Sequence, residues 1–393
     1  MENQADTNLP PTDLDLNYRS ISDLRRIASD LQSNQYHSIK IYLDYLNVGK
    51  TLPPTVDDKP SSDKPALEQC SGDNHQEFTF RQDMEDVLVD IITNSFVLND
   101  LTLDFGGMSC PKCLLNDSSF FARIRPISKT LRRLYLRKSE IKTTVCQIDE
   151  EKRAYEPLAN FLSGQLDLEE IQFQQFNGDD VIVRALGHCI NINIFHLKLV
   201  DNFDAWLMST NVFPKWPALR SFRMDAAGVH LDRVIDSLKA HCPLLEDLSL
   251  PALAHADKTL VLSLMELLRM RSAQLVQISI RDLAVAEDNF LIFLCEKLPN
   301  IRHLDISGGS RFAGVAVKSV VWNKLQYLDI TRCNNIGSKF VFAVLEVCHK
   351  LTEFRMSATT MREESVIQKI RDAGFLKANE WNQGAMWTKE AQD

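Results

Sequence analysis

The sequence predicts an α/β solenoid, in which short strands alternate with helices and neighbouring strand–helix units stack side by side. Two observations lead to this prediction. The apolar pattern Lxx(L/I/F)x(L/I/M/F) recurs along the chain, and from Leu168 onward its steps are 26, 25, 26, 30, 26, 24 and 26 residues. Each match is followed by a turn and then by a segment with apolar residues at helical spacing. A regular period of this length is typical of a stacked repeat array.

Each match is predicted to form one strand. Its first, fourth and sixth residues are apolar, and the last two of these are spaced as on a strand with one buried face. The first two steps, of 33 and 37 residues, indicate insertions. Because one unit cannot bury both of its apolar faces alone, strands should line a concave wall and helices a convex wall. The matches begin at Leu98, Leu131, Leu168, Ile194, Leu219, Leu245, Leu275, Ile301, Leu325 and Leu351.

The unit LQYLDITRCNNIGSKFVFAVLEVCHKL shows the pattern most completely. Its helical segment places on one face Val341, Val344, Leu345 and Cys348. The string resembles the cysteine-containing leucine-rich repeat, which reads L-x-x-L-x-L-x-x-C, a turn, an amphipathic helix and C-x-x-L. That subtype is characteristic of the F-box leucine-rich-repeat proteins and related adaptors. The resemblance covers residues 98–375 and implies a right-handed leucine-rich-repeat solenoid of about ten units.

Three segments at the start of the chain lack the repeat pattern. Residues 1–18 are polar and predicted to be a disordered tail, and residues 51–76 are predicted to be a flexible linker or loop. Residues 19–50 contain a short helical segment. Its helical spacing involves Ile21, Leu24, Ile27 and Leu31.

The same region contains fragments of an F-box sequence. NLPP at 8–11 and ISDLRRIAS at 21–29 match such fragments, but the interval between them is too short and no V-C-x-x-W ending follows. Two alternatives remain open: the segment 19–50 is a degenerate F-box remnant, or the chain is a relative without an F-box.

Capping elements are predicted at both ends of the array, because a solenoid would otherwise expose its core. Residues 77–97 fit a helical cap, whose inward residues would be Met84, Val87, Leu88 and Ile91. Residues 376–393 form a C-terminal tail or cap. Its tryptophans, Trp381 and Trp387, could fold over the terminal repeat.

Composition excludes several classes of function. The formal net charge of −9 argues against a general nucleic-acid or anionic-membrane binder, because phosphate binding needs a basic surface. No apolar run reaches the length of about 18 residues that a membrane span requires. The acidic start does not resemble a signal peptide, and nine cysteines without one suggest free thiols in a reducing compartment. The family resemblance implies a cytoplasmic or nuclear location, or both.

The cysteines of the repeats are predicted to fill core positions. Cys242 and Cys348 each precede the first apolar residue of the next strand by three, and Trp216 and Trp322 occupy the same place in other repeats. A slot that accepts both Cys and Trp indicates packing rather than chemistry. Cys333 occupies the consensus cysteine position of its repeat.

No enzyme, cofactor or metal site is predicted. The phosphate-loop, dinucleotide, G-x-S-x-G and H-E-x-x-H motifs are absent from the sequence. Cys110 and Cys113 form a C-x-x-C pair, but zinc needs two further ligands and no second pair is evident. A metal- or redox-dependent protein using this pair is therefore the least favoured alternative.

A partner-binding face is predicted from the residues between the inward ones, which project from the concave sheet. Their mixture of both charge signs with Tyr and His suits a protein partner, since aromatic residues and Arg dominate interface hot spots. The candidates are Arg133, Tyr135, Arg137, Lys198, Arg223, Arg281, His303, Asp305, Tyr327, Asp329 and Arg355.

The expected function is a non-enzymatic interaction protein. The family resemblance implies the substrate-recognition subunit of an SCF-type ubiquitin ligase, which would hold its target on the concave face and work with a Skp-type adaptor and a cullin. The alternative is a leucine-rich-repeat scaffold, adaptor or inhibitor without an F-box and without a ubiquitin role.

Overall fold

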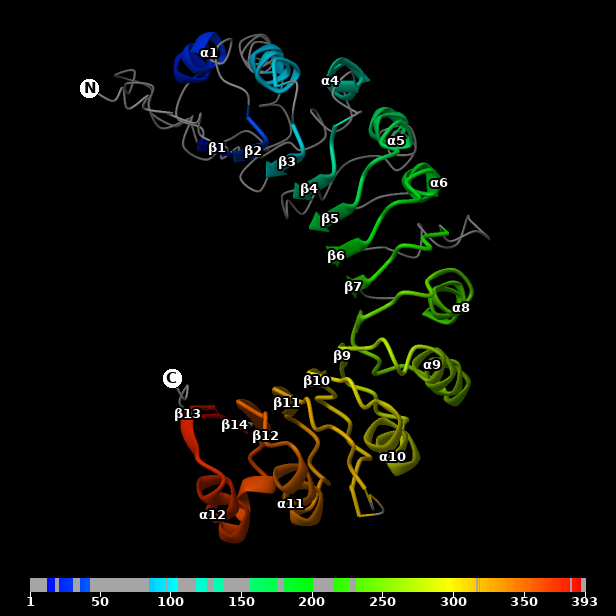
Figure 1. The fold of residues 1–393 in the computed structure, drawn as a ribbon, viewed down its shortest axis with the longest axis vertical. Coiled ribbons are helices and arrows are strands. Elements are labelled where there is room, and N and C mark those ends of the chain that lie inside the picture. The colour runs from blue at the N-terminus through cyan, green and yellow to red at the C-terminus, as the bar shows by residue number, and fades with distance from the viewer. Residues whose placement is uncertain are drawn as a thin grey trace, which may run out of the picture. The chain divides into compact units, whose positions relative to one another are not determined.

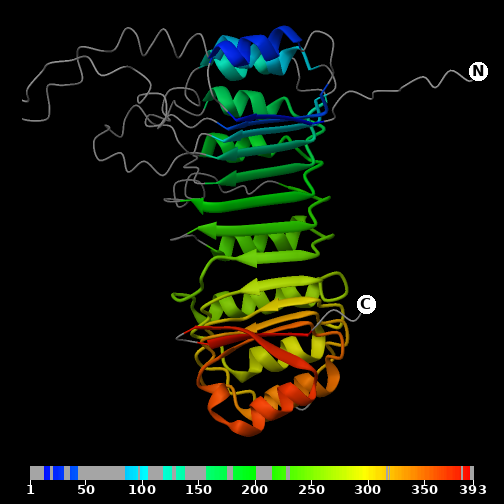
Figure 2. The same cartoon turned by 90° about the vertical axis from the view of Figure 1, so that its left-hand side faces the viewer.

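The chain has the predicted α/β architecture, with alternating strands and helices and a largely parallel arrangement of strands. The computed structural model describes residues 13–17, 21–30, 36–42, 85–95, 98–104, 118–125, 130–137, 156–174, 180–200, 215–226, 231–315, 317, 319–381 and 384–389. The chain divides into two compact units, Met1–Cys189 and Ile190–Asp393. In each unit, helices cover one face of the sheet and leave the other uncovered (Figure 1 and Figure 2).

The first unit contains parallel strands that lie in chain order. They are β1 (Asp13–Asn17), β2 (Ser38–Tyr42), β3 (Asp100–Asp104), β4 (Arg133–Arg137) and β5 (Glu170–Gln174). The helices are α1 (Ile21–Asp30), a helix at residues 85–93, α4 (Ser118–Ile124), α5 (Glu156–Ser163) and α6 (Asp180–Leu186). The inward residues Leu101, Leu134 and Ile171 are register partners on three neighbouring strands. Each is at most 1% exposed, so the predicted apolar positions form the core.

The repeat array begins earlier than predicted. Leu14 of β1 aligns with Ile39 of β2, which in turn aligns with Leu101, so both strands continue the repeat register. The prediction of a disordered tail is therefore wrong for residues 13–17, while residues 1–12 lie outside the described ranges. The segment 19–50 contains α1 but also the repeat strand β2.

The helix at residues 85–93 buries the predicted face. Val87, Leu88 and Ile91 are 6%, 1% and 0% exposed, whereas Met84 lies outside the described ranges. This helix stands between β2 and β3 in the chain, so it is the helix of a repeat and not an end cap. The linker predicted at 51–76 also lies outside the described ranges.

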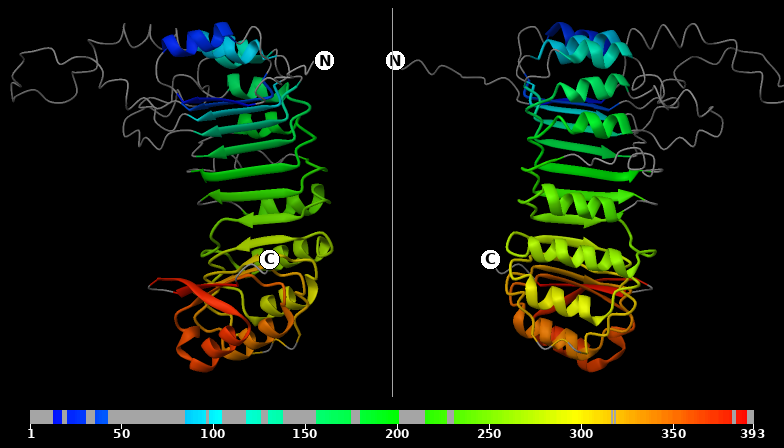
Figure 3. Two further views of the ribbon diagram at one scale, coloured as in Figure 1. Left: turned by 60° about the vertical axis from the view of Figure 1, so that its left-hand side comes forward. Right: turned by 90° about the vertical axis from the view of Figure 1, so that its right-hand side faces the viewer.

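The second unit continues the same design. Its parallel strands are β6 (Ile194–Val200), β7 (Ser221–Ala226), β8 (Asp247–Leu250), β9 (Gln277–Ile280), β10 (His303–Asp305), β11 (Tyr327–Ile330) and β12 (Glu353–Ser357). Its helices are α8 (Leu231–His241), α9 (Lys258–Met270), α10 (Asp288–Lys297), α11 (Ser338–Val347) and α12 (Glu364–Asp372). Figure 3 shows the strands from one side and the helices that cover them from the other. Within the described ranges, no helix has both the length and the hydropathy to cross a bilayer.

The predicted register of one repeat is wrong by two residues. In β6, Phe195 aligns with Phe222 of the next strand, so the repeat starts at Ile192 and not at Ile194. Ile192 is fully buried, whereas Ile194 is partly exposed. The error arose because the string INIFHLKL fits the apolar pattern in both registers. Apart from Ile194 itself, a shift of two leaves His196, Leu197 and Lys198 on their predicted faces, since strand side chains alternate with a period of two.

The repeat between β10 and β11 has no helix among its described residues. Phe312 fills the core there, 1% exposed and stacked on Phe290 of α10 with ring centres 6.3 Å apart. The chain can approach the next repeat because Gly314 has a φ of +69°, and a Cβ there would lie 2.7 Å from Cβ of Phe340. The glycine-rich string SGGSRFAG, predicted as a turn, therefore replaces the helix with an irregular loop.

The C-terminal tail forms a β-hairpin that joins the sheet. Strands β13 (Phe375–Trp381) and β14 (Gly384–Lys389) pair antiparallel, and β14 also pairs antiparallel with β12. Trp387 aligns with Phe354 and is 2% exposed, whereas Trp381 on the outer strand remains 38% exposed. Of the two tryptophans, Trp387 packs as predicted and Trp381 does not.

The slot three residues before the first apolar residue of a repeat is buried wherever Cys or Trp occupies it, as predicted. Once the register of β6 is corrected, Cys189 occupies this slot together with Trp216, Cys242, Trp322 and Cys348. All five are at most 2% exposed. Burial also raises the pKa of the thiols to about 12, as for Cys189 and Cys242, which keeps them protonated. The prediction of packing thiols is confirmed for the described cysteines, whereas Cys110 and Cys113 lie outside the described ranges.

Candidate partner-binding face

The sheet face that the helices leave uncovered, called here the open face, carries the predicted binding residues. Burial alternates along each strand: in β4, Leu134 and Leu136 are buried, while Arg133, Tyr135 and Arg137 lie on the opposite face. The same alternation holds in β5, β8 and β9. Successive side chains along a strand point to opposite faces of the sheet. The face on which each residue lies could therefore be predicted from the sequence.

On the open face of the first unit, charged residues pair across neighbouring strands. Arg133 donates two hydrogen bonds to the carboxylate of its register partner Asp100, one of them 2.5 Å long. Four residues further along the same strands, Arg137 donates to Asp104 over 3.2 Å. Such cross-strand pairs fix the direction of the guanidinium groups. These arginines are therefore preorganised and nearly charge-matched.

Tyr135 lies between the two arginines on β4. Its hydroxyl donates to Oε1 of Gln174 over 2.5 Å, and burial raises the pKa of the phenol, which is therefore neutral. A hollow of about 410 Å³ lies beside it, with Lys40 and Thr102 among the lining residues. Lys40 belongs to β2, a strand that the sequence did not predict.

In the second unit, a hydrogen-bond network holds Arg223 on the open face. Arg223 Nε donates to Oδ2 of Asp247 over 2.7 Å, and Ser221 Oγ donates to the same oxygen over 2.7 Å. Nε2 of His196 lies 3.0 Å from Ser221 Oγ. Desolvation by burial, followed by the Arg223 charge, lowers the pKa of His196 to about 4, so its imidazole is neutral at neutral pH.

This group contains a serine, a histidine and an aspartate, but it does not have the order of a hydrolase triad. In such a triad the carboxylate orients the imidazole, which in turn activates the hydroxyl. Here the Asp247 carboxylate accepts hydrogen bonds from Ser221 and Arg223 instead. The network therefore orients Arg223.

Three side chains on adjacent strands form a cluster of aromatic and cationic groups, the His303–Tyr327–Arg355 cluster. The His303 and Tyr327 ring centres lie 6.1 Å apart, and Arg355 Cζ lies 5.3 Å from the centre of the Tyr327 ring. The three residues come from β10, β11 and β12. Cation–π and ring contacts of this kind restrict the side chains before any partner arrives.

A hollow of about 270 Å³ lies next to this cluster. Its floor contains Ser249 and Ser279, which are register partners on β8 and β9. Arg223 flanks this pair on one side and Asp305 on the other, again as register partners. Small residues between two charges of opposite sign create a recess that can receive a side chain of a partner.

One of the predicted residues, Asp329, lies in more restricted surroundings than expected. Asp329 is only 7% exposed, and its carboxylate accepts from Thr331 N over 2.8 Å and from Tyr327 OH over 3.2 Å. It therefore positions Tyr327 and offers little surface to a partner. Arg281 lies 3.6 Å from Asp225, while Lys198 is exposed on β6.

The recess over Ser249 and Ser279 was missed by sequence reasoning. A search for charged and aromatic residues passes over serines, although two small residues at the same position of consecutive repeats were the available signal. Among the described residues, no group of three or more His, Cys, Asp or Glu side chains is placed to hold a metal ion.

Comparisons with known proteins give only a distant structural likeness. No protein-family model matches the chain, and no curated protein matches it. Among 25 matching chains of solved structures, one belongs to a complex of Rad7 and Elc1 from yeast. It shares 15% identity with this chain at a TM-score of 0.41, covering 68% of this chain and 71% of that one.

Proposed function

We propose that the chain is a non-catalytic interaction protein that binds a protein partner on the open face. The observation that carries the proposal is the His303–Tyr327–Arg355 cluster beside the recess over Ser249 and Ser279. Tyr and Arg are enriched among the residues that dominate interface energetics, especially where they are held in place next to a pocket. The cluster supplies the fixed Tyr and Arg side chains, and the recess supplies the adjacent pocket.

The charges of the open face support a protein partner over a nucleic acid. Arg133, Arg223 and Arg355 are each paired with a carboxylate on the same or a neighbouring strand. A phosphate track needs unmatched positive charge along the surface. A surface with alternating signs instead favours a protein with the complementary alternation.

A recess-filling variant tests this proposal. Ser279→Arg places a long side chain in the recess without touching the buried face of β9, and Gln274→Arg adds the same side chain at an exposed loop position. Affinity purification followed by mass spectrometry should show partners that bind the wild type and Gln274→Arg but not Ser279→Arg. Equal recovery with both variants would contradict binding at the recess.

A more specific role is that of the substrate-recognition subunit of an SCF-type ubiquitin ligase. Its support is the resemblance to cysteine-containing repeats, together with the packing of Cys333, which is fully buried and donates through Sγ to the carbonyl of Ile306 over 3.2 Å. In this role the open face would hold the target, and a Skp-type adaptor and a cullin would supply the rest of the ligase.

The described part of residues 13–42 favours the alternative of an adaptor without an F-box. These residues form a strand, a helix and a second strand, and the two strands pair in the register of the repeats. The segment 21–29 is therefore part of a repeat. Co-purification of a Skp-type adaptor and a cullin with the full chain is the discriminating measurement. Their absence, with residues 1–97 intact, would contradict the ligase role and leave the binding proposal standing.

A further inference from the structure

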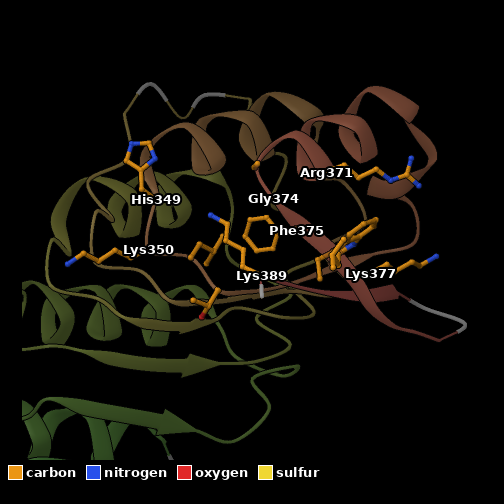
Figure 4. A pocket seen from close by; sticks show the side chains of 12 residues that line it. His349, Lys350, Arg371, Gly374, Phe375, Lys377 and Lys389 are labelled. Carbon is orange, nitrogen blue, oxygen red and sulfur yellow. The ribbon is translucent and has the colours of Figure 1, made fainter. Parts of the chain in front are cut away.

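A cavity of about 1130 Å³ lies at the C-terminal end of the second unit, and its lining contains none of the candidate residues of the open face. The ends of α11 and α12 and the hairpin strands β13 and β14 line it, as Figure 4 shows. Phe375 and Lys389 lie at its centre, with His349 and Lys350 on one side and Arg371 and Lys377 on the other. Several of these side chains are exposed, so the cavity opens to solvent.

The lining of this cavity is strongly basic. It contains Lys350, Arg371, Lys377 and Lys389 and no carboxylate, in a chain whose net charge is −9. Lys377 is paired with Glu380, and Arg371 lies 3.9 Å from Glu364. Within the described part of the chain, Lys350 and Lys389 have no carboxylate partner at ion-pair distance.

The helix ends at the cavity offset only part of the positive charge of its side chains. α11 and α12 both end at the cavity, and the C-terminal end of a helix carries a partial charge of about −0.5 that attracts cations. Two such ends supply about −1 against the two cationic side chains, Lys350 and Lys389, that have no carboxylate partner among the described residues. The cavity therefore retains excess positive charge.

One residue that lines the cavity also carries a buried hydrogen-bond donor without an acceptor. Nε1 of Trp387, a lining residue that is 2% exposed, has no acceptor among the described residues. A buried N–H left without a partner is costly and calls for an explanation. An acceptor such as a ligand carboxylate would satisfy it.

The apolar residues narrow the class of ligand. Leu351, Phe375 and Trp387 are almost fully buried beneath the cations, and Leu376 is 56% exposed at the rim. A single inorganic anion would leave the exposed side chain of Leu376 without a contact, and the cavity is larger than most small-molecule sites. We propose that the cavity is a second docking site, which binds an acidic peptide segment of a protein partner through its carboxylate and apolar side chains.

A defined peptide tests the proposal directly. The probe is a fluorescein-labelled twelve-residue peptide of glutamate and leucine, and its control replaces every glutamate by glutamine. Fluorescence anisotropy with the full chain should show binding of the glutamate peptide only, with an affinity that falls as salt is added. Equal binding of the glutamine peptide would overturn the proposal. Complete displacement of the glutamate peptide by millimolar inorganic phosphate would indicate a simple anion site and also overturn it.

Matched variants locate the site. Lys350→Glu with Lys389→Glu should weaken binding about tenfold or more. The control, Lys258→Glu with Lys339→Glu, reverses two exposed charges in the first turns of α9 and α11, where a carboxylate is well tolerated. Thermal melts should show that both proteins are folded. Equal loss of affinity in both variants, or in neither, would contradict the assignment.

The indole donor is tested by Trp387→Phe, which keeps an aromatic ring in the core but removes the N–H. Binding of the glutamate peptide should weaken severalfold. An unchanged affinity would show that this N–H does not contact the peptide. The proposal is independent of the open face: Ser279→Arg should leave peptide affinity unchanged, so failure of one proposal does not imply failure of the other.

Discussion

The guanidinium group of Arg355 stands over the ring of Tyr327, with Cζ 5.3 Å from the ring centre, and the same arginine pairs with Glu353 on its own strand. Tyr327 in turn donates to Asp329. Both side chains are therefore fixed from two directions before a partner binds. A preorganised pair loses little conformational entropy on binding, which makes it a strong candidate for an energetic centre.

Replacing Tyr327 by Ala should therefore affect binding more than stability. The free energy of unfolding should fall by about 1–2 kcal/mol, because the ring contact and one hydrogen bond are lost. Partner affinity should fall about tenfold or more. Urea denaturation and a binding assay on the partner recovered by affinity purification would measure both. Tyr327→Phe is the matched control, and equal affinity of the Ala variant and the wild type would contradict this role.

Reversing charge at Arg133 and Arg137 should weaken partner binding without unfolding the chain. The cost in stability should be about 1 kcal/mol for the exposed pair of Arg133 with Asp100, and larger for Arg137, because its partner Asp104 is only 9% exposed. The exchange Asp100→Arg with Arg133→Glu restores an ion pair in the opposite orientation, so it should recover stability but not binding. A loss of thermal stability as large as that of a core substitution would show that these residues are not on an exposed face.

The His196 network should make stability depend on pH. The pKa of His196 is about 4 in the folded chain and 6.5 in the unfolded chain, so between these values the unfolded state binds more protons. Its contribution to stability is complete above pH 6.5 and is lost as pH falls towards 4. The maximum loss is about 3 kcal/mol, reduced by partial exposure.

Denaturation of His196→Gln across this pH range is the measurement. The amide can still contact Ser221 but does not titrate, so the variant should lose less stability than the wild type between pH 6.5 and 4. His188→Asn, at an exposed site, is the control and should follow the wild type. An identical pH dependence of His196→Gln and the wild type would contradict the assignment.

Arg271 should contribute more to stability than any exposed arginine. It is 8% exposed and donates to the carbonyls of Cys242 and Lys239 at the C-terminal end of α8, over 3.0 and 2.7 Å. Arg271→Ala should lower the free energy of unfolding by about 2–4 kcal/mol, because two carbonyls lose donors and a cavity forms. Arg220→Ala, which removes only an exposed pair with Glu246, should cost less than about 1 kcal/mol. Equal effects would contradict the capping role.

The described cysteines should resist alkylation in the folded chain. Cys189, Cys242, Cys295, Cys333 and Cys348 are at most 2% exposed, and burial raises the pKa of each thiol. Site-resolved mass spectrometry after iodoacetamide treatment should find them modified only when denaturant is present. Labelling of any of them under native conditions would show local opening of its repeat.

The sequence was sufficient to predict the repeat architecture, because each repeat carries its own apolar pattern. The buried positions of the strands and the helical face of Val341 and Val344 follow from that local periodicity alone. The open face follows from strand alternation. Even the two-residue register error at Ile194 preserved the face of His196 and Lys198.

Features that depend on distant contacts could not be predicted in this way. The strand β2 has Tyr36 in place of the first leucine and lies 62 residues before Leu98, so it did not fit the period. The hairpin of β13 and β14 carries no repeat pattern and is defined by pairing with β12. The basic cavity joins the ends of two helices to that hairpin, and only the folded chain brings these segments together.

The hairpin also determines how copies of this protein can meet. A parallel sheet offers an edge onto which an identical strand can always be added, whereas β14 reverses the direction of the chain beside β12. The outer strand β13 has a bulge between Lys377 and Asn379 and carries the charges of Lys377 and Glu380. End-to-end growth into filaments is therefore disfavoured at this edge, which keeps the surfaces of each copy available to other proteins.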